Sequence, residues 1–163
     1  MNVFMPFRKA DVANGEGVRV TLFVSGCRIH CPHCFNKEAQ DFNFGVPYTK
    51  EIQDEIIKAL EPDWVQGLTI LGGEPFEPEN QQGIFPLLMA VREKYGFKKD
   101  IWVYTGYVLE KDLTPGGSKY IRDLTDVIKT YIDVLVDGPF IEELKDPSLE
   151  FRGSSNQRIL RFR

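Results

Sequence analysis

The sequence has little net charge and no long apolar run. Its formal net charge is −4 over 163 residues, with more acidic than basic side chains. This balance argues against a protein whose main task is to grip nucleic acid, which needs a basic surface. No apolar run approaches the ~18 residues that span a bilayer, and residues 1–9 do not resemble a secretory signal. We therefore expect a cytoplasmic protein with neither a nucleic-acid nor a membrane partner.

Cysteine is also scarce. Only three cysteines occur, and all lie between Cys27 and Cys34. An odd number within eight residues is a poor disulfide framework, and it is more typical of a thiolate cluster in a reducing compartment. A chain of this length can bury about two-thirds of its unfolded surface. We expect a single domain spanning residues 1–163.

Apolar runs and helical patterns alternate along the chain. Buried strands are predicted at residues 18–24, 68–71, 101–104 and 133–136. Helices are predicted at residues 52–60 after Thr49 as N-cap, at 84–95 before Gly96, and at 121–128. This alternation predicts an α/β fold with a mostly parallel sheet and helices on its outer face. Because a complete eight-fold barrel needs about 250 residues, we expect an incomplete, open β/α barrel.

Polar or glycine-rich segments follow each predicted strand. They are Cys27, Gly72-Gly73-Glu74-Pro75, Thr105-Gly106 and Asp137-Gly138. In open α/β sheets, ligands bind outside the carboxyl ends of the strands. We therefore expect these four segments to converge on one edge of the sheet and to form the functional site.

The cysteines follow the pattern C-x3-C-x2-C at Cys27, Cys31 and Cys34. Three thiolates can bind three irons of a 4Fe–4S cluster, in which each iron takes one cysteine. With no fourth cysteine, one iron stays open, as the metal does in catalytic zinc sites. A zinc site completed by His30 or His33, and free buried thiols, are the alternatives. Zinc is disfavoured because structural zinc sites usually draw on two separated ligand pairs.

The cysteine pattern resembles the signature of the radical S-adenosylmethionine (SAM) enzymes. Further segments are similar to the activators of the anaerobic (class III) ribonucleotide reductases, and the match runs from about residue 11 to residue 158. These segments are Asn14-Gly15-Glu16-Gly17, Leu22–Cys27, Cys34-Phe35-Asn36-Lys37, Gly72–Pro75, Trp102–Tyr107, Val134–Gly138 and Arg152–Arg158.

The resemblance implies a specific reaction. In that family the open iron binds the methionine part of SAM, and one electron from the reduced cluster releases a 5′-deoxyadenosyl radical. That radical takes a hydrogen from the Cα of a glycine in the large subunit of the reductase. A low-potential protein such as flavodoxin is the expected electron donor. No side chain is assigned as a catalytic acid or base, because the cofactors carry the chemistry.

The resemblance also implies which residues bind the cofactor. The turn Gly72, Gly73, Glu74 and Pro75 would hold the methionine amino group through backbone carbonyls, although many relatives carry Asp where this chain has Glu74. We expect the backbone of His33, Cys34 and Phe35 to line the adenine pocket, with plain core as the alternative for Phe35. The oxygens of Thr105 and Asp137 suit the ribose or the sulfonium, unless they cap following segments.

The last residues, 150–163, form a tail rich in arginine: Arg152, Arg158, Arg161 and Arg163. Such a run is usually a solvated face, and arginine also pairs well with carboxylates. The similarity of Arg152–Arg158 to the family suggests that the tail packs on the site or on the reductase. Two other functions are kept open: a small radical SAM enzyme of the deazaguanine-forming type, which the segment Gly153–Asn156 argues against, and a non-catalytic zinc-binding interaction module.

Overall fold

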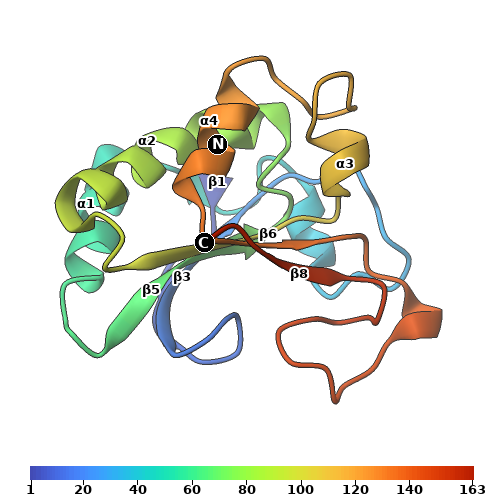
Figure 1. Cartoon of the computed structure of the whole chain (residues 1–163), viewed down its shortest axis with the longest axis horizontal. Helices are drawn as coiled ribbons and strands as arrows, with labels where there is room; N and C mark the ends of the chain where they lie inside the picture. Colours follow the sequence, from blue (N-terminus) through green and yellow to red (C-terminus); the bar gives the residue numbers. More distant parts are fainter.

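One mixed sheet runs through the structure, a computed structural model that describes all residues from 1 to 163 (Figure 1). Its centre is parallel and consists of β3 (Val18–Val24), β5 (Val65–Gly72), β6 (Asp100–Tyr104) and β7 (Val134–Asp137). Antiparallel strands flank this centre: β1 (Asn2–Val3), β2 (Arg8–Asp11), β4 (Val46–Pro47) and β8 (Arg158–Arg161). The strand order is β4-β1-β3-β5-β6-β7-β8, with β2 also paired to β3. The predicted α/β class and the parallel centre are therefore confirmed.

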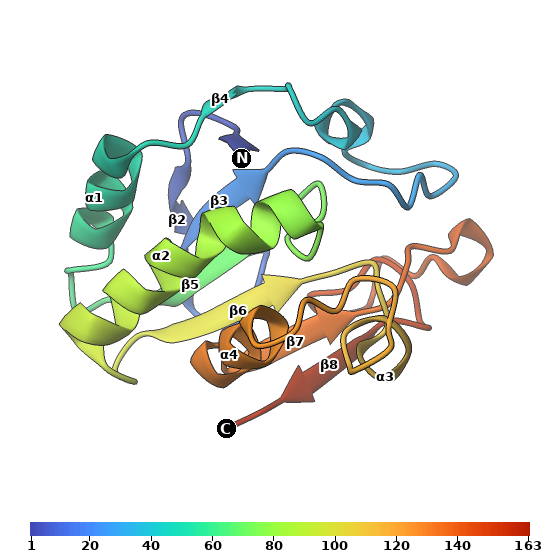
Figure 2. The ribbon, with the colours of Figure 1, turned by 90° about the horizontal axis from the view of Figure 1, so that it is seen from above.

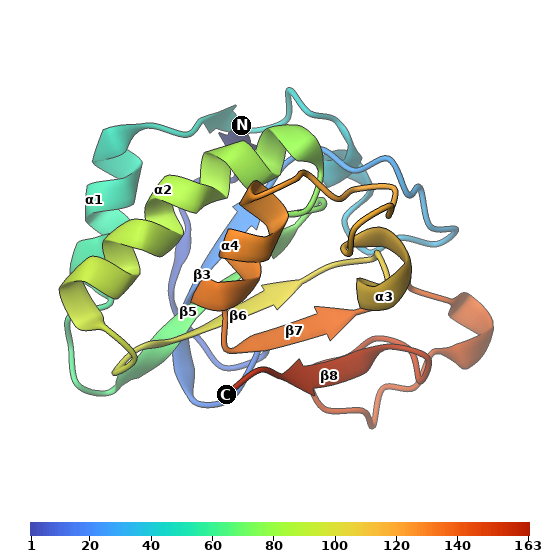
Figure 3. The same ribbon diagram turned by 45° about the horizontal axis from the view of Figure 1, so that its top comes forward.

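The helices cover one face of this sheet, as Figures 2 and 3 show. They are α1 (Lys50–Ala59), α2 (Pro78–Tyr95) and α4 (Leu124–Tyr131). The Thr49 hydroxyl accepts a hydrogen bond from the Ile52 N–H at 3.3 Å, so the predicted N-cap is confirmed. Gly96 ends α2 at φ 57°, a conformation that favours glycine. The short α3 (Leu109–Asp112) and the 3-10 turns η1 (Lys37–Gln40) and η2 (Glu142–Leu144) lie in the connections.

Alternate strand residues divide the core between the two faces. On the helix side, Ile101 and Val103 of β6 pack in one large cluster with the buried side chains of the helices, such as Leu87. On the other side, Trp102 joins Val134 and Val136 in a small cluster. Phe151 packs edge-on against Trp102 at 5.5 Å between ring centroids. The tail therefore covers the sheet face that carries no helix.

A fully buried arginine, Arg19, lies on the sheet face that carries no helix. Arg19 of β3 donates to the Thr69 hydroxyl at 2.6 Å and pairs with Asp100 at 2.5 Å. It also donates to the carbonyl of Glu16 at 2.9 Å, while Thr69 donates to the carbonyl of Asn14 at 2.7 Å. These bonds hold the segment before β3 against the sheet and fix the position of Asn14.

None of the helices has the length and hydropathy of a membrane-spanning helix.

Candidate cofactor site

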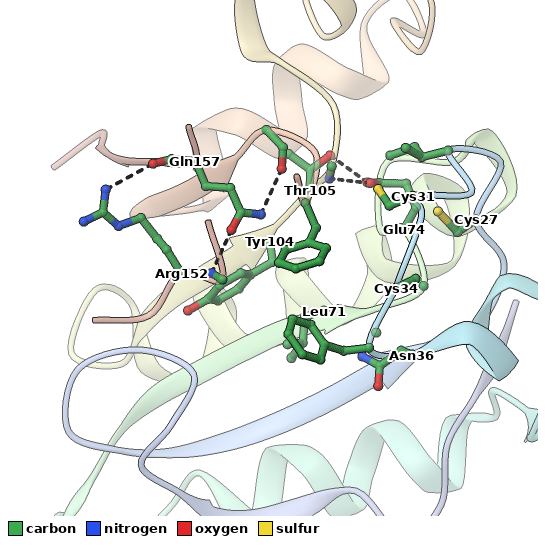
Figure 4. A pocket seen from close by; sticks show the side chains of 18 of the residues that line it. Cys27, Cys31, Cys34, Asn36, Leu71, Glu74, Tyr104, Thr105, Arg152 and Gln157 are labelled. Carbon is green, nitrogen blue, oxygen red and sulfur yellow. Dashed lines mark hydrogen bonds between the residues drawn. The ribbon is translucent and has the colours of Figure 1, made fainter. Parts of the chain in front are cut away.

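A cavity of about 380 Å³ lies at the carboxyl ends of the parallel strands (Figure 4). This volume is in the range of small-molecule sites, about 300–1,000 Å³. Its walls come from the segment before β3, from the cysteine loop, from the ends of β5 and β6, and from the tail. The lining includes Asn14, Cys27, Cys31, Cys34, Gly73, Glu74, Thr105, Gly138, Phe151 and Arg152. The convergence of segments that the sequence predicts is present.

All three cysteines line this cavity, and all are unpaired and half-buried. Cys31 and Cys34 also line a second cavity, together with His30 and His33, so the loop between the two cavities is thin. Both histidines have left-handed backbones, with φ 53° at His30 and φ 60° at His33. Strained residues of this kind persist where the surrounding structure enforces them, and they cluster at functional sites.

Burial dominates the chemistry of the free thiols. It raises the pKa of Cys27 to about 11, and the carboxylates of Glu74 and Glu77 add to this rise. Burial raises the pKa of Cys31 as well. Thiolate is the form that binds metal, so metal binding must release protons from these side chains. The thiols are not gathered around one point with other ligands as the ligands of a single ion would be.

The turn after β5 lies directly against the cysteine loop. The Glu74 N–H donates to the carbonyl of Gly26 at 2.8 Å, and a Cβ on Gly73 would lie only 2.6 Å from that same oxygen. Glycine at position 73 is therefore required for the close approach. The Gly73 carbonyl accepts no hydrogen bond within the protein, so it is free for a donor on a ligand. Pro75 is buried and does not line the cavity.

The Glu74 carboxylate is used inside the protein. It is 1% exposed and accepts hydrogen bonds from the Thr105 hydroxyl at 2.7 Å, the Gly106 N–H at 2.7 Å and the Phe76 N–H at 2.8 Å. Burial raises the pKa of Glu74 to about 7. Because the carboxylate ties the end of β5 to the end of β6, Glu74 and Thr105 shape the cavity wall together.

Asp137 is placed differently from the expectation. It does not line the cavity, and its carboxylate accepts from Arg158 at 2.9 and 2.6 Å and from the Leu109 N–H at 2.9 Å. The carboxylate therefore binds the start of α3, which precedes Asp137 in the chain, and it does not cap a following segment. Direct contact of Asp137 with a ligand stays a prediction that its hydrogen bonds do not support.

His33 and Phe35 flank Cys34 on the surface. His33 is exposed and lines the second cavity but not the main one. Phe35 lines the main cavity but is 68% exposed, and its ring contacts that of Phe140 at 4.9 Å between centroids. The core alternative for Phe35 is therefore wrong. A backbone contact of this segment with adenine stays a prediction.

The side of the cavity opposite the cysteines contains groups that were not assigned as cofactor-binding residues from the sequence (Figure 4). The Tyr104 hydroxyl and the Arg152 Nε are buried without a hydrogen-bond partner, and both residues line the cavity. Gln157 donates to the Gly138 carbonyl at 3.0 Å and accepts from the Gly153 N–H at 2.8 Å, which fixes this part of the tail. Buried polar groups without partners are costly.

This combination fits a site for an iron–sulfur cluster with a small polar cofactor. The thiols supply soft ligands on one side. On the other side, the side chains of Tyr104 and Arg152 contribute polar residues to the lining. The sequence contains one signal for each residue: Tyr104 ends a predicted strand, and Arg152 lies in a segment similar to the family. Whether their polar atoms find hydrogen-bond partners depends on the tertiary fold.

Comparisons with known proteins agree with this fit. A family model described as "4Fe-4S single cluster domain" matches residues 13–160. The chain is 43% identical to the anaerobic ribonucleoside-triphosphate reductase-activating protein of Escherichia coli K12, over 94% of either chain. It is 40% identical to the protein of that name from Haemophilus influenzae over 98% of either chain. For the protein of that name from Enterobacteria phage T4, identity is 36% over 91% of this chain and 87% of the relative. The chain therefore belongs to the family of the anaerobic ribonucleoside-triphosphate reductase-activating proteins and contains its 4Fe-4S single cluster domain.

Proposed function

We propose that this protein activates an anaerobic ribonucleoside-triphosphate reductase by generating a glycyl radical on its large subunit. The observation that carries the proposal is the convergence of three unpaired thiols and a glycine-rich turn on one cavity in a chain of this family. The reaction consumes SAM and one electron. A protein donor such as flavodoxin would supply that electron in the cytoplasm.

The cysteine loop would hold the cluster. Cys27, Cys31 and Cys34 each bind one iron, and the fourth iron is left for SAM. When bound, the cluster and SAM supply the one-electron chemistry that produces a 5′-deoxyadenosyl radical. The side chains of this chain do not act as acid or base in that step, and we assign no catalytic residue.

The remaining residues bind and orient SAM. The free carbonyl of Gly73 accepts from the methionine amino group, next to the cysteines. We assign Tyr104 and Arg152, which line the far side of the cavity, to contacts with polar groups of SAM. The backbone of His33, Cys34 and Phe35 contacts the adenine. Glu74 and Thr105 hold the wall in shape through their mutual hydrogen bond.

The fold suits a protein substrate. We interpret the sheet as an incomplete barrel of the radical SAM type within a single domain, residues 1–163. The strands β4 and β8 end the sheet on opposite sides and do not pair with each other. This leaves the cavity open on one side, through which a glycine loop of the large subunit can enter. The tail, 150–163, lines the cavity and would also face that loop.

Electron paramagnetic resonance tests the function. The reconstituted protein is incubated anaerobically with SAM, a reductant and the large subunit of a class III reductase. A glycyl radical signal is expected with the parent protein and not with Cys31→Ala. SAM cleavage without that signal would point to another small radical SAM enzyme. A colourless protein with stoichiometric zinc after anaerobic reconstitution would point to the zinc-binding module.

A further inference from the structure

Glu77 is a buried carboxylate whose contacts are not explained by its own helix. It occupies the N-cap position of α2 but makes no side-chain hydrogen bond to the N–H groups of that helix. The residue is 0% exposed. A carboxylate buried to this degree is tolerated only when hydrogen-bond donors and opposite charges surround it.

Four donors surround it. Oε1 accepts from the backbone N–H of Arg28 at 2.9 Å and from the Tyr107 hydroxyl at 2.7 Å. Oε2 accepts from the Arg28 guanidinium at 2.7 Å and from the Lys119 ammonium at 3.0 Å. These donors come from the cysteine loop, from the segment after β6, and from the segment before α4. Glu77 therefore joins three connections that are far apart in the sequence.

The contact with Arg28 is the one that matters for the site. Arg28 directly follows Cys27, so the Arg28 N–H belongs to the peptide that leaves Cys27. The Arg28 guanidinium adds a second contact to Glu77 and lies over the ring of Phe42 at 4.3 Å. Both the backbone and the side chain of the residue after Cys27 are thus held from outside the loop.

We propose that Glu77 is a positioning residue that fixes the start of the cysteine loop and holds Cys27 at the cavity before metal binds. This inference rests on the proposed function, because Cys27 is a metal ligand only under that proposal. Glu77 touches neither the cavity nor the cysteines through a hydrogen bond, and it acts through Arg28.

The chain offers matched variants. Glu77→Ala removes all four contacts. Glu77→Gln removes the charge but keeps an oxygen for the Arg28 N–H and the Tyr107 hydroxyl. Glu79→Gln is the control, because Glu79 pairs with the same guanidinium at 2.6 Å but on the surface, and it does not contact the backbone of the loop.

The first measurement uses the protein without metal. The rate of alkylation of each cysteine by iodoacetamide is followed by peptide mass spectrometry, and circular dichroism checks that each variant is folded. Loss of hydrogen bonds to a buried charged group favours local opening by about tenfold or more. We expect Cys27 to react about tenfold faster in Glu77→Ala, and within about threefold of the parent in Glu77→Gln and Glu79→Gln. Glu77→Gln loses the charge and the two hydrogen bonds that Oε2 accepts from Arg28 and Lys119, but it keeps an acceptor for the Arg28 N–H. The excess in Glu77→Ala over Glu77→Gln therefore reports release of the loop backbone.

The second measurement uses the reconstituted protein and a chelator. Iron loss is expected about tenfold faster from Glu77→Ala and within about threefold of the parent from the two glutamine variants. Equal Cys27 alkylation in parent and Glu77→Ala, or an equal rise at all three cysteines, would overturn the proposal. A tenfold rise of the Cys27 alkylation rate in Glu77→Gln would also overturn the proposal, because this variant keeps the acceptor for the Arg28 N–H. This result can be obtained even if Glu77→Ala does not fold. If the parent takes up no iron, the proposed function fails. The alkylation rates still test whether Glu77 fixes the start of the cysteine loop.

Discussion

Replacement of Arg158 by Met tests how the tail is attached to the sheet. Arg158 contacts Asp137 through two nitrogens, at 2.9 and 2.6 Å, and Asp137 is 1% exposed. Breaking a buried ion pair from one side costs about 3–5 kcal/mol. The side chain of Arg158 is 42% exposed, so water can replace part of its interaction. Its second pair, with the 65% exposed Glu110, adds little. We expect Arg158→Met to lower the free energy of unfolding by about 2 kcal/mol.

The control lies on the same strand. Arg161 pairs with Glu16, and both side chains are about half exposed. Such pairs contribute about 0–1 kcal/mol, so Arg161→Met should cost less than about 1 kcal/mol. For a chain of this size, a loss of about 2 kcal/mol lowers the melting temperature by about 4–8 °C. Thermal and urea unfolding of the protein without metal, followed by circular dichroism, measures both quantities.

The double variant sharpens the test. Adding Asp137→Asn to Arg158→Met removes the buried charge that the single variant leaves unpaired, so it should recover part of the lost stability. The reasoning is refuted if Arg158→Met destabilises no more than Arg161→Met. It is also refuted if Asp137→Asn lowers the stability of Arg158→Met further.

Three other predictions concern the cavity and the cysteine loop. The raised pKa of Glu74 means that the folded state keeps a proton which the unfolded state has lost between about pH 4.5 and 7. The free energy of unfolding of the parent, relative to that of Glu74→Gln, should therefore fall by about 3 kcal/mol as pH rises through this window. Urea unfolding of both proteins at pH 5 and pH 8 measures it, and an equal difference between the two proteins at both pH values would contradict the prediction. Cys31→Ala should abolish SAM cleavage, measured as 5′-deoxyadenosine by chromatography, because one of three iron ligands is lost; retained product would exclude the three-cysteine cluster. His33→Gly should preserve iron content and raise the unfolding free energy by up to about 1 kcal/mol, because its left-handed backbone is strained for histidine; a loss of iron would show that the imidazole itself is needed.

The sequence predicted the parallel centre of the fold because those strands are apolar along their length. The predicted strand at residues 18–24 coincides with β3, and Gly96 ends α2 as expected. The antiparallel strands were not predicted, for a physical reason. β1 and β4 have two residues each, and β8 begins and ends with arginine. Their pairing depends on neighbours far away in the sequence, so no local pattern reveals it.

The site was predictable where it follows from strand ends. Parallel strands bring their carboxyl ends to one edge, so Cys27, Gly73 and Thr105 meet as expected. Asp137 also ends a strand, but its carboxylate pairs with Arg158 on β8. Pairing of the tail arginines with carboxylates was one of the alternatives from the sequence, whereas the strand β8 was not predicted. Tyr104 was missed because only the folded environment leaves its hydroxyl without a partner.

Two walls of the cavity, on either side of the ends of β5 and β6, come from segments far apart in the sequence, within residues 13–36 and 138–157. During synthesis, the cysteine loop leaves the ribosome well before Phe151 and Arg152, which follow much later in the chain. Domains fold as their residues emerge, so a nascent chain has all three thiols before it has a closed wall. A chain interrupted after β7 would keep every cysteine and still leave the site open to water and oxidants. Synthesis of residues 138–157 therefore sets the earliest moment at which a cluster in this site is protected.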